Sequence, residues 1–393
     1  MDLKEQSLKL HKDAKGKIAT VSKVKLETKE DLSLAYTPGV AYVCKEIEKD
    51  KELAYTYTSK QNMVAVITDG SAVLGLGNIG PYAAIPVMEG KSILLHELAG
   101  VDSIPLCLKT QDTEEIIKIC KALEPTLGAI NLEDISAPRC VEIERRLIKE
   151  MDIPVFHDDQ HGTSIIVAAA FINVERLTKK PLKDMTVVLS GTGAAGSMIA
   201  KMLKKIGVGQ IYAYNKDGVV SKRNYANYDF LLKELLDEGT LSSPDESKKT
   251  LADLMVNANA FIGVSAANLV SKEMVKSMAE NPIVFAMANP NPEIGYDDAK
   301  DAGAYICGSG RSDYPNQINN VLAFPGLFKG ALMAKAKKIT EGMKLKAAYA
   351  IANLISDEEL NPNYIVPSAF DKRVVPAVSK AVCDEAIAEG VCR

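Results

Sequence analysis

The chain has 393 residues, 47% of them hydrophobic and 25% charged, which suffices for two domains that each bury a core. A formal net charge of −4 without any block of like charges argues against nucleic acid or a membrane surface as a partner. No run approaches the roughly 18 apolar residues of a membrane span, and the seven cysteines are scattered as in reduced cytoplasmic proteins. We therefore expect a cytoplasmic protein.

Apolar runs alternate with amphipathic stretches through the first half of the chain. Short runs rich in β-branched residues favour strands, whereas apolar residues at helical spacing favour helices. On these patterns we expect strands at 63–70, 92–100, 128–134 and 154–159, and helices at 112–123 and 137–151.

The second half has the pattern of repeated strand–helix–strand units. We expect a strand, a helix and a strand at 186–191, 194–207 and 210–215, then strands at 260–265, 283–289 and 304–310 with a helix at 271–280. Because these strands are apolar almost throughout, they fit a parallel sheet covered on both faces. After residue 326 the chain is largely helical. The fold class that follows is α/β.

A glycine-rich turn follows the strand at 186–191 and opens the next helix. Its residues are Gly191, Thr192, Gly193, Ala194, Ala195 and Gly196. In this context the glycines permit a tight turn, close approach to a pyrophosphate, and packing of the helix on the strand. The turn predicts a Rossmann-like domain that binds a nicotinamide or flavin dinucleotide. The alternative is a glycine turn without a ligand.

The end of the following strand bears on the choice between NAD and NADP. An acid there would hydrogen-bond the ribose 2′-hydroxyl of NAD. The chain instead has Asn215, which is neutral, followed by Lys216, which either meets a 2′-phosphate or is simply solvated. The sequence therefore leaves NAD and NADP both open.

Two pairs of acids end predicted strands: Glu133 with Asp134, and Asp158 with Asp159. The carboxyl ends of parallel strands share one edge of a sheet, so these carboxylates would crowd together. A divalent cation relieves that repulsion, and an all-oxygen set favours Mg²⁺ or Mn²⁺.

Two other interpretations of these acidic stretches stay open. His157 and His161 would suit zinc, although neither cysteine support nor an HExxH pattern accompanies them. Alternatively, Asp159 and Asp134 would only cap the helical sequences that follow them.

Several stretches, taken in chain order, resemble malic enzymes of the short bacterial type. They are YTPGVA (36–41), TDGSAVLGLGNIGPYAAIPVMEGK (68–91), LEDISAP (132–138), FHDDQHGT (156–163), GTGAAG (191–196), MANPNPE (287–293) and NQINNVLAFPG (316–326). The resemblance covers nearly the whole chain. It implies oxidative decarboxylation of L-malate to pyruvate and CO₂, with NAD or NADP and with Mg²⁺ or Mn²⁺.

The resemblance also implies roles for individual residues. Tyr36 is similar to the general acid, Lys91 to the general base, and Asp158 to the acid that holds this lysine. The implied metal ligands are Glu133, Asp134 and Asp159, and the implied contacts to substrate and nicotinamide are Asn289, Asn319 and Asn320. Without the resemblance, Tyr36 would be an ordinary half-buried tyrosine and Lys91 a surface lysine.

The implied mechanism sets requirements for Lys91 and Tyr36. We expect burial and the adjacent cation to lower the pKa of Lys91, so that its amine takes the proton of the malate hydroxyl. Tyr36 would then protonate the carbon that CO₂ leaves. The longer malic enzymes carry an arginine just before LGLG, where this chain has Ser71, Ala72 and Val73. What holds the substrate carboxylates is therefore open.

We expect two α/β domains. Residues 158–319 would form the Rossmann-like dinucleotide domain, and 1–157 with 320–393 would form a second α/β domain for substrate, metal and oligomerisation. The resemblance implies a homodimer or a larger homo-oligomer. Two alternatives remain: another metal-assisted 2-hydroxyacid or amino-acid dehydrogenase, and a dinucleotide-sensing module without catalysis.

Overall fold

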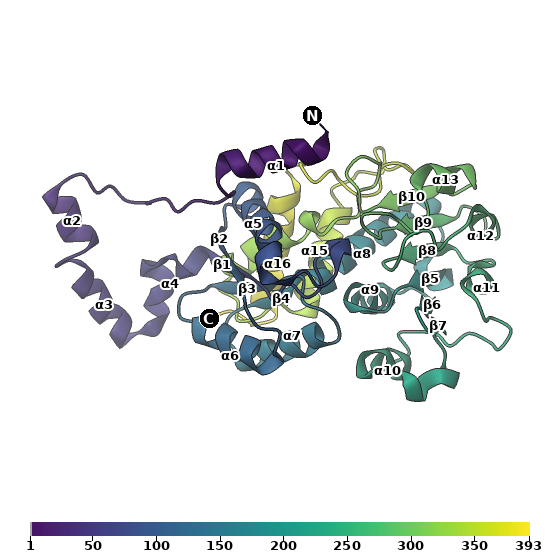
Figure 1. Ribbon diagram of the computed structural model, residues 1–393, viewed down its shortest axis with the longest axis horizontal. Coiled ribbons are helices and arrows are strands. Elements are labelled where there is room, and N and C mark those ends of the chain that lie inside the picture. The colour runs from purple at the N-terminus through teal and green to yellow at the C-terminus, as the bar shows by residue number, and fades with distance from the viewer. Residues whose placement is uncertain (1) are drawn as a thin grey trace.

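Two separate sheets, each flanked by helices, organise the chain (Figure 1). The structure is a computed structural model and describes residues 2–393. It confirms the α/β fold class expected from the sequence. Within the described residues, no helix is long and apolar enough to cross a membrane.

The first sheet has four parallel strands in the order β2-β1-β3-β4. They are β1 (Met63–Thr68), β2 (Asp102–Cys107), β3 (Ala129–Leu132) and β4 (Val155–His157). Three predicted strands are thereby confirmed as β1, β3 and β4. Because β3 and β4 are parallel neighbours, their carboxyl ends lie at one edge of the sheet.

The predicted strand at 92–100 is wrong, because this segment is the end of helix α5 (Gly80–Ala99). The buried residues of α5 recur at helical spacing: Ala84, Met88, Ser92, Leu95 and Ala99. An apolar run as short as SILLHELAG does not separate a strand from a buried helix. The strand that follows is β2, which the sequence analysis missed. It carries Pro105 at the edge of the sheet, where a missing N–H is tolerated.

The second sheet has six strands in the order β10-β9-β8-β5-β6-β7. They are β5 (Thr186–Ser190), β6 (Gln210–Asn215), β7 (Gly218–Val219), β8 (Ala260–Gly263), β9 (Ile283–Ala286) and β10 (Ile306–Ser309). All neighbouring pairs are parallel except β6 with β7. The chain runs outward from β5 in one direction and then returns to β8 on its other side. This strand order is that of a Rossmann fold, whose ligands bind at the switch point between β5 and β8.

Helices cover both sheets. Helices α6 (Thr113–Leu123) and α7 (Arg139–Glu150) pack together and share a buried core with the first sheet. Helix α8 (Asp158–Thr178) follows β4 directly and packs on α9 (Ala194–Lys205), so it connects the two sheets. The shorter helices of the second half are α10 (Phe230–Asp237), α11 (Leu251–Met255), α12 (Lys272–Lys276) and α13 (Tyr296–Asp301).

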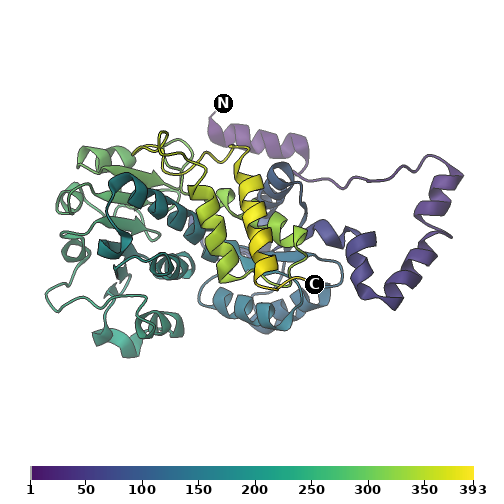
Figure 2. The ribbon, with the colours of Figure 1, turned by 180° about the vertical axis from the view of Figure 1, so that it is seen from behind.

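The chain ends in a group of packed helices: η6 (Asn320–Leu322), α14 (Phe324–Met333), α15 (Glu341–Ala352) and α16 (Val374–Ala388). Helix α14 contacts α5, and α15 contacts α8. These helices therefore touch both halves of the chain, as the yellow-green and yellow ribbons in the middle of Figure 2 show.

The N-terminal region consists of short helices that are not packed into the two sheets. Helix α1 (Leu3–Ala14) is followed by an extended segment and then by α2 (Lys29–Ala35), α3 (Val40–Lys49) and the short α4 (Ala54–Tyr57). Figure 1 shows α2 and α3 projecting away from the two sheets. No residue between 18 and 50 is buried. We refer to residues 24–50 as the arm.

Candidate functional site

Three carboxylates converge where β3 and β4 end. Glu133 and Asp134 follow β3, and Asp159 lies in the first turn of α8. One carboxylate oxygen from each lies within 4.8 Å of the others, and Glu133 and Asp134 are buried. An all-oxygen set of this kind fits a hard divalent cation such as Mg²⁺ or Mn²⁺.

The backbone of Asp134 holds this arrangement. Its φ of 54° is a left-handed conformation that aspartate tolerates better than most residues do. Its N–H donates to Asp159 Oδ2 at 2.7 Å and ties the end of β3 to α8. Helices α7 and α8 both begin without a side-chain cap, so the capping interpretation of these acids is wrong.

Lys91 extends from α5 into the same group of acids. Its Nζ lies 2.5 Å from Asp158 Oδ2 and 3.0 Å from Glu133 Oε1. The lysine side chain is 12% exposed, and Asp158 is fully buried. The geometry therefore brings Lys91 and Asp158 together with the acids that the sequence analysis assigned to a metal.

The chain's own charges favour the ammonium form of Lys91. Burial lowers the pKa of Lys91, but the carboxylates of Asp158, Glu133 and Asp159 outweigh burial and raise this pKa above its usual value. The expected lowering relied on burial and an adjacent cation together, and burial alone does not outweigh these carboxylates. Burial raises the pKa of Glu133 and of Asp158, and Lys91 only partly offsets that rise.

Glu144 contacts both histidines of the HDDQH stretch. This buried residue of α7 accepts from the N–H of His157 at 2.8 Å, and its Oε2 lies 2.9 Å from His161 Nε2. On the other side of the ring, Lys344 Nζ lies 3.1 Å from His161 Nδ1. His161 therefore has a protein partner at each nitrogen, which does not support zinc. Glu144 and Lys344 were missed, although an acid on the buried face of a predicted helix was a readable signal.

The glycine turn has the geometry that a pyrophosphate needs. Gly191 has φ 100°, and a Cβ on Gly196 would lie 1.9 Å from Gly191 O, so both positions require glycine. A Cβ on Gly193 would meet nothing within 4 Å, which leaves open space at the start of α9. Helix α9 begins at Ala194 without a side-chain cap, so its first N–H groups are available to an anion.

Asn215 stands beside this turn at the end of β6. Its Nδ2 donates to Thr192 Oγ1 at 3.3 Å, and its Oδ1 accepts from the N–H of Asp217 at 2.9 Å. Lys216 is exposed. A neutral side chain thus occupies the strand end where an acid would select the ribose of NAD.

The loop after β9 carries Asn289 toward the first half of the chain. A Cβ on Gly75 would lie 2.1 Å from Asn289 O, so the LGLG segment packs directly on this loop. The fully buried Glu293 supports the loop by accepting from the N–H of Ser265 at 2.8 Å and of Ala288 at 3.1 Å. The sequence analysis did not single out Glu293, although it ends the MANPNPE stretch.

The two adjacent asparagines at η6 differ in position. Asn319 caps η6, because its Oδ1 accepts from the N–H of Val321 at 3.0 Å. Asn320 lies beside the acids: a Cβ on Gly162 would lie 2.7 Å from Asn320 Cβ and 2.0 Å from Asp158 Oδ1.

An arginine lies next to Ser71, in the segment for which the sequence analysis left the carboxylate-binding residue open. Arg139 Nη2 donates to Asp69 Oδ2 at 2.7 Å and to Ser71 Oγ at 3.0 Å. The sequence analysis did not identify Arg139, because its position in α7 lies far along the chain from Ser71.

Tyr36 is the predicted site residue that the structure does not bring to this group. It lies between α2 and α3 in the arm and is 65% exposed. Its backbone contacts stay within the arm: its N–H donates to Leu32 O at 2.9 Å, and its carbonyl accepts from the N–H of Val40 at 2.7 Å.

The chain combines a Rossmann sheet that has an open glycine turn with a second sheet that carries a lysine among converging carboxylates. This combination defines the class of dinucleotide-dependent oxidoreductases. Comparison with known proteins narrows this class. The malic enzyme N-terminal domain model matches residues 15–148, and the malic enzyme NAD binding domain model matches residues 160–387.

Individual relatives agree with these matches over the whole chain. The bifunctional malic/malolactic enzyme of Bacillus subtilis (strain 168) is 51% identical over 393 residues, which cover 100% of this chain and 95% of that protein. The NAD-dependent malic enzyme of Geobacillus stearothermophilus is 52% identical over 381 residues, covering 96% of this chain and 78% of that one. A crystal structure of the NAD-dependent malic enzyme from Thermotoga maritima has a TM-score of 0.91 at 46% identity and covers 98% of this chain and 99% of that one. The chain therefore belongs to the malic enzyme family.

Proposed function

We propose that this enzyme converts L-malate to pyruvate and CO₂ at the group formed by Lys91 and the acids, with reduction of NAD or NADP. The observation that carries the proposal is the position of Lys91 Nζ, 2.5 Å from Asp158 and 3.0 Å from Glu133. A base for the malate hydroxyl thus stands directly beside the oxygen ligands that a cation would use.

Each group in the site has a separate task in this proposal. Glu133, Asp134 and Asp159 would hold Mg²⁺ or Mn²⁺, which when bound supplies Lewis-acid polarisation of the malate oxygens. The turn at 191–196 would hold the dinucleotide that accepts the hydride. Asn289 and Asn320 approach from the second half of the chain and would orient substrate and nicotinamide, whereas the capping role of Asn319 leaves its amide nitrogen for such a contact.

The proton movements balance within the chain's own residues. Once Glu133, Asp134 and Asp159 hold a cation, they would favour the ammonium form of Lys91 less, so that its amine takes the hydroxyl proton of malate as hydride leaves C2 while Asp158 orients the amine. When the C3–C4 bond breaks, its electron pair remains with C3 and CO₂ departs. Tyr36 gives its phenolic proton to C3, and the proton collected by Lys91 then returns to the Tyr36 phenolate, so both residues regain their starting protonation. The hydroxyl proton of malate is thereby matched by the third proton of the pyruvate methyl group.

The domain division expected from the sequence remains part of this proposal. Residues 158–319 would bind the dinucleotide, and 1–157 with 320–393 would bind metal and substrate. The NAD binding domain model instead extends to residue 387, and helices α14 and α15 contact α5 and α8, so the C-terminal helices would connect the two domains. All seven cysteines are free, as the proposed cytoplasmic location requires.

The direct test of the activity is absorbance at 340 nm. We expect the purified enzyme to reduce both NAD⁺ and NADP⁺ when malate and Mn²⁺ are present, without strong preference, because Asn215 neither repels a 2′-phosphate nor binds the 2′-hydroxyl as an acid does. Omission of any one component should abolish the signal. No reduction with any combination of malate, either nucleotide and either metal would refute the proposal.

A further inference from the structure

Asn131 is a polar residue in the interior of the first sheet. It lies in β3 and is fully buried. Its neighbours in register are Val66 of β1 and Phe156 of β4, and both are apolar and buried. Burial of an amide among apolar side chains is unfavourable unless the amide gains a hydrogen bond. An asparagine at this position therefore needs a partner that replaces the lost water.

That partner is one of the acids of the site. Asn131 Nδ2 donates to Glu133 Oε2 at 2.8 Å. The two residues are two positions apart along β3 and its end, so their side chains project from the same face of the sheet. Within the described residues, Asn131 Oδ1 has no hydrogen-bond partner. Across residues 2–393, the bond to Glu133 is thus the one hydrogen bond that the Asn131 side chain makes.

Glu133 therefore has a partner at each of its carboxylate oxygens. Lys91 Nζ lies 3.0 Å from Oε1, and Asn131 donates to Oε2. The lysine comes from α5 and the asparagine from β3, so two different elements hold the same carboxylate. These contacts restrict its rotation. The position of the Glu133 carboxylate relative to Asp134 and Asp159 is thus set by the chain itself.

Lys91 is the less constant of the two partners. Its Nζ lies closer to Asp158 Oδ2, at 2.5 Å, than to Glu133 Oε1. In the proposed mechanism its amine also exchanges a proton with malate. The Asn131 amide carries no charge and keeps its two hydrogens, so its bond to Glu133 persists through every step.

We propose that Asn131 is a positioning residue for the cation site, which keeps the Glu133 carboxylate beside Asp134 and Asp159 so that the three acids are ready for Mg²⁺ or Mn²⁺. This inference rests on the proposed role of Glu133 as a metal ligand. Residues that orient a metal ligand through a hydrogen bond contribute about 10–100-fold to metal affinity. Asn131 acts on the reaction through Glu133 alone.

Calorimetric titration with Mn²⁺ tests this inference on Asn131→Leu, which keeps the approximate size of the side chain and removes the donor. We expect the Mn²⁺ affinity to fall about 10–100-fold, whereas NADH binding measured by fluorescence stays at the wild-type level. The Mn²⁺ concentration that gives half of the maximal rate of malate oxidation should rise by the same factor, while the rate at saturating Mn²⁺ is largely retained. Asn131→Val, which is smaller and suits a strand, carries the measurement if the leucine variant does not fold.

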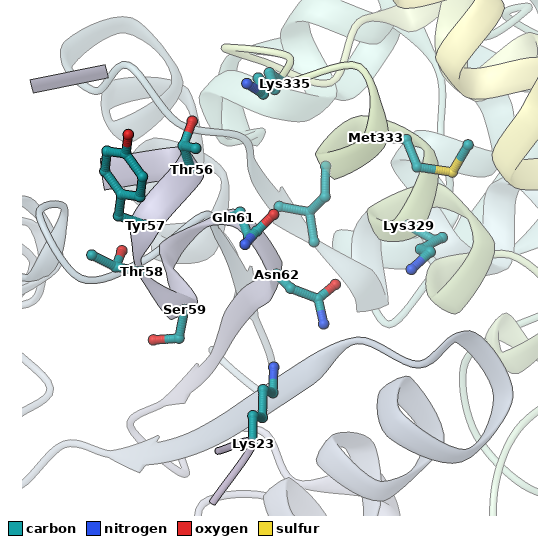
Figure 3. A pocket seen from close by; sticks show the side chains of 11 residues that line it. Lys23, Thr56, Tyr57, Thr58, Ser59, Gln61, Asn62, Lys329, Met333 and Lys335 are labelled. Carbon is teal, nitrogen blue, oxygen red and sulfur yellow. The ribbon is translucent and has the colours of Figure 1, made fainter. Parts of the chain in front are cut away.

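Two asparagines elsewhere in the chain serve as matched controls. Asn173 in α8 is equally buried and donates to Ala352 O at 3.0 Å and to Ile365 O at 2.9 Å. Asn62, labelled in Figure 3 where it lines a pocket of about 640 Å³, donates from its amide to Asp102 Oδ2 at 3.2 Å. Asn173→Leu should lower the melting temperature, and Asn62→Leu removes another amide-to-carboxylate bond. Neither variant should change the Mn²⁺ affinity.

Glu133→Gln separates this inference from the proposed activity. If Glu133→Gln loses Mn²⁺ binding but Asn131→Leu and Asn131→Val keep the wild-type affinity, the role of Asn131 is overturned and the proposed activity stands. An equal loss of affinity in Asn173→Leu would also overturn the inference, because general destabilisation would then explain the effect. Unchanged Mn²⁺ affinity in Glu133→Gln would remove Glu133 from the cation site and overturn both.

Discussion

Lys91→Ala should abolish both malate oxidation and the reverse reduction of oxaloacetate, whereas Tyr36→Phe should abolish pyruvate formation and retain much of the oxaloacetate reduction. Hydride transfer between malate and the keto acid needs a base at the C2 oxygen, and Lys91 lies among the acids that would place this oxygen. Delivery of a proton to C3 belongs to a later step. General acids and bases contribute about 10²–10⁴-fold, so each defect should be easy to measure by initial rates at 340 nm.

A matched control for the tyrosine exists within the arm. Tyr42 lies in α3, the helix that follows the predicted donor, and is 72% exposed, so Tyr42→Phe removes an equivalent hydroxyl and should leave both reactions near wild-type rates. If Tyr36→Phe impaired oxaloacetate reduction as deeply as Lys91→Ala does, while binding Mn²⁺ normally, the tyrosine would belong to the hydride step and the separation of roles would be wrong.

Asp159→Asn should abolish metal-dependent turnover while leaving dinucleotide binding nearly intact. Asp159 contributes one of the converging oxygens and also accepts from the N–H of Asp134 at 2.7 Å, so the change removes a ligand charge and disturbs the backbone that holds a second ligand. Residues that only hold a metal ligand in place already contribute about 10–100-fold to affinity, and a direct ligand should exceed this. Mn²⁺ titration by calorimetry and NADH fluorescence measure the two effects separately.

Asp152→Asn serves as the control for the loss of charge. Asp152 is exposed and precedes β4, the same strand that Asp159 follows. This variant should bind Mn²⁺ as the wild type does. Unchanged Mn²⁺ affinity in Asp159→Asn would remove this residue from the set of ligands.

The sequence predicted the candidate site best where the local backbone conformation and the chemistry of the site both require a particular type of residue. The turn at 191–196 was readable because Gly191 and Gly196 both occupy positions that no side chain fits. The acids after β3 and β4 were readable because parallel neighbours bring their carboxyl ends together. In both cases a local pattern fixes a three-dimensional arrangement.

Features that depend on distant parts of the chain were missed or wrong. The segment 92–99 is helical because five buried positions of α5 repeat at helical spacing along this helix, which its last eight residues alone do not reveal. Glu144 and Lys344 meet at His161 from helices α7 and α15; the buried acid was readable from the helical pattern of α7, but the residues that it contacts were not. The pKa of Lys91 follows from the sum of three carboxylates around one buried amine, so its direction required their positions.

The measurement that tests the central claim most directly is the product balance of a single reaction. The enzyme is incubated with malate, NAD⁺ and Mn²⁺, and NADH, CO₂, pyruvate, oxaloacetate and lactate are quantified together. Oxidative decarboxylation at Lys91 and the acids predicts equal amounts of NADH, CO₂ and pyruvate, with neither oxaloacetate nor lactate accumulating. NADH matched by oxaloacetate without CO₂ would show a dehydrogenase that does not decarboxylate. Lactate and CO₂ without net NADH would also contradict the account, because the cofactor would then return its hydride to the product.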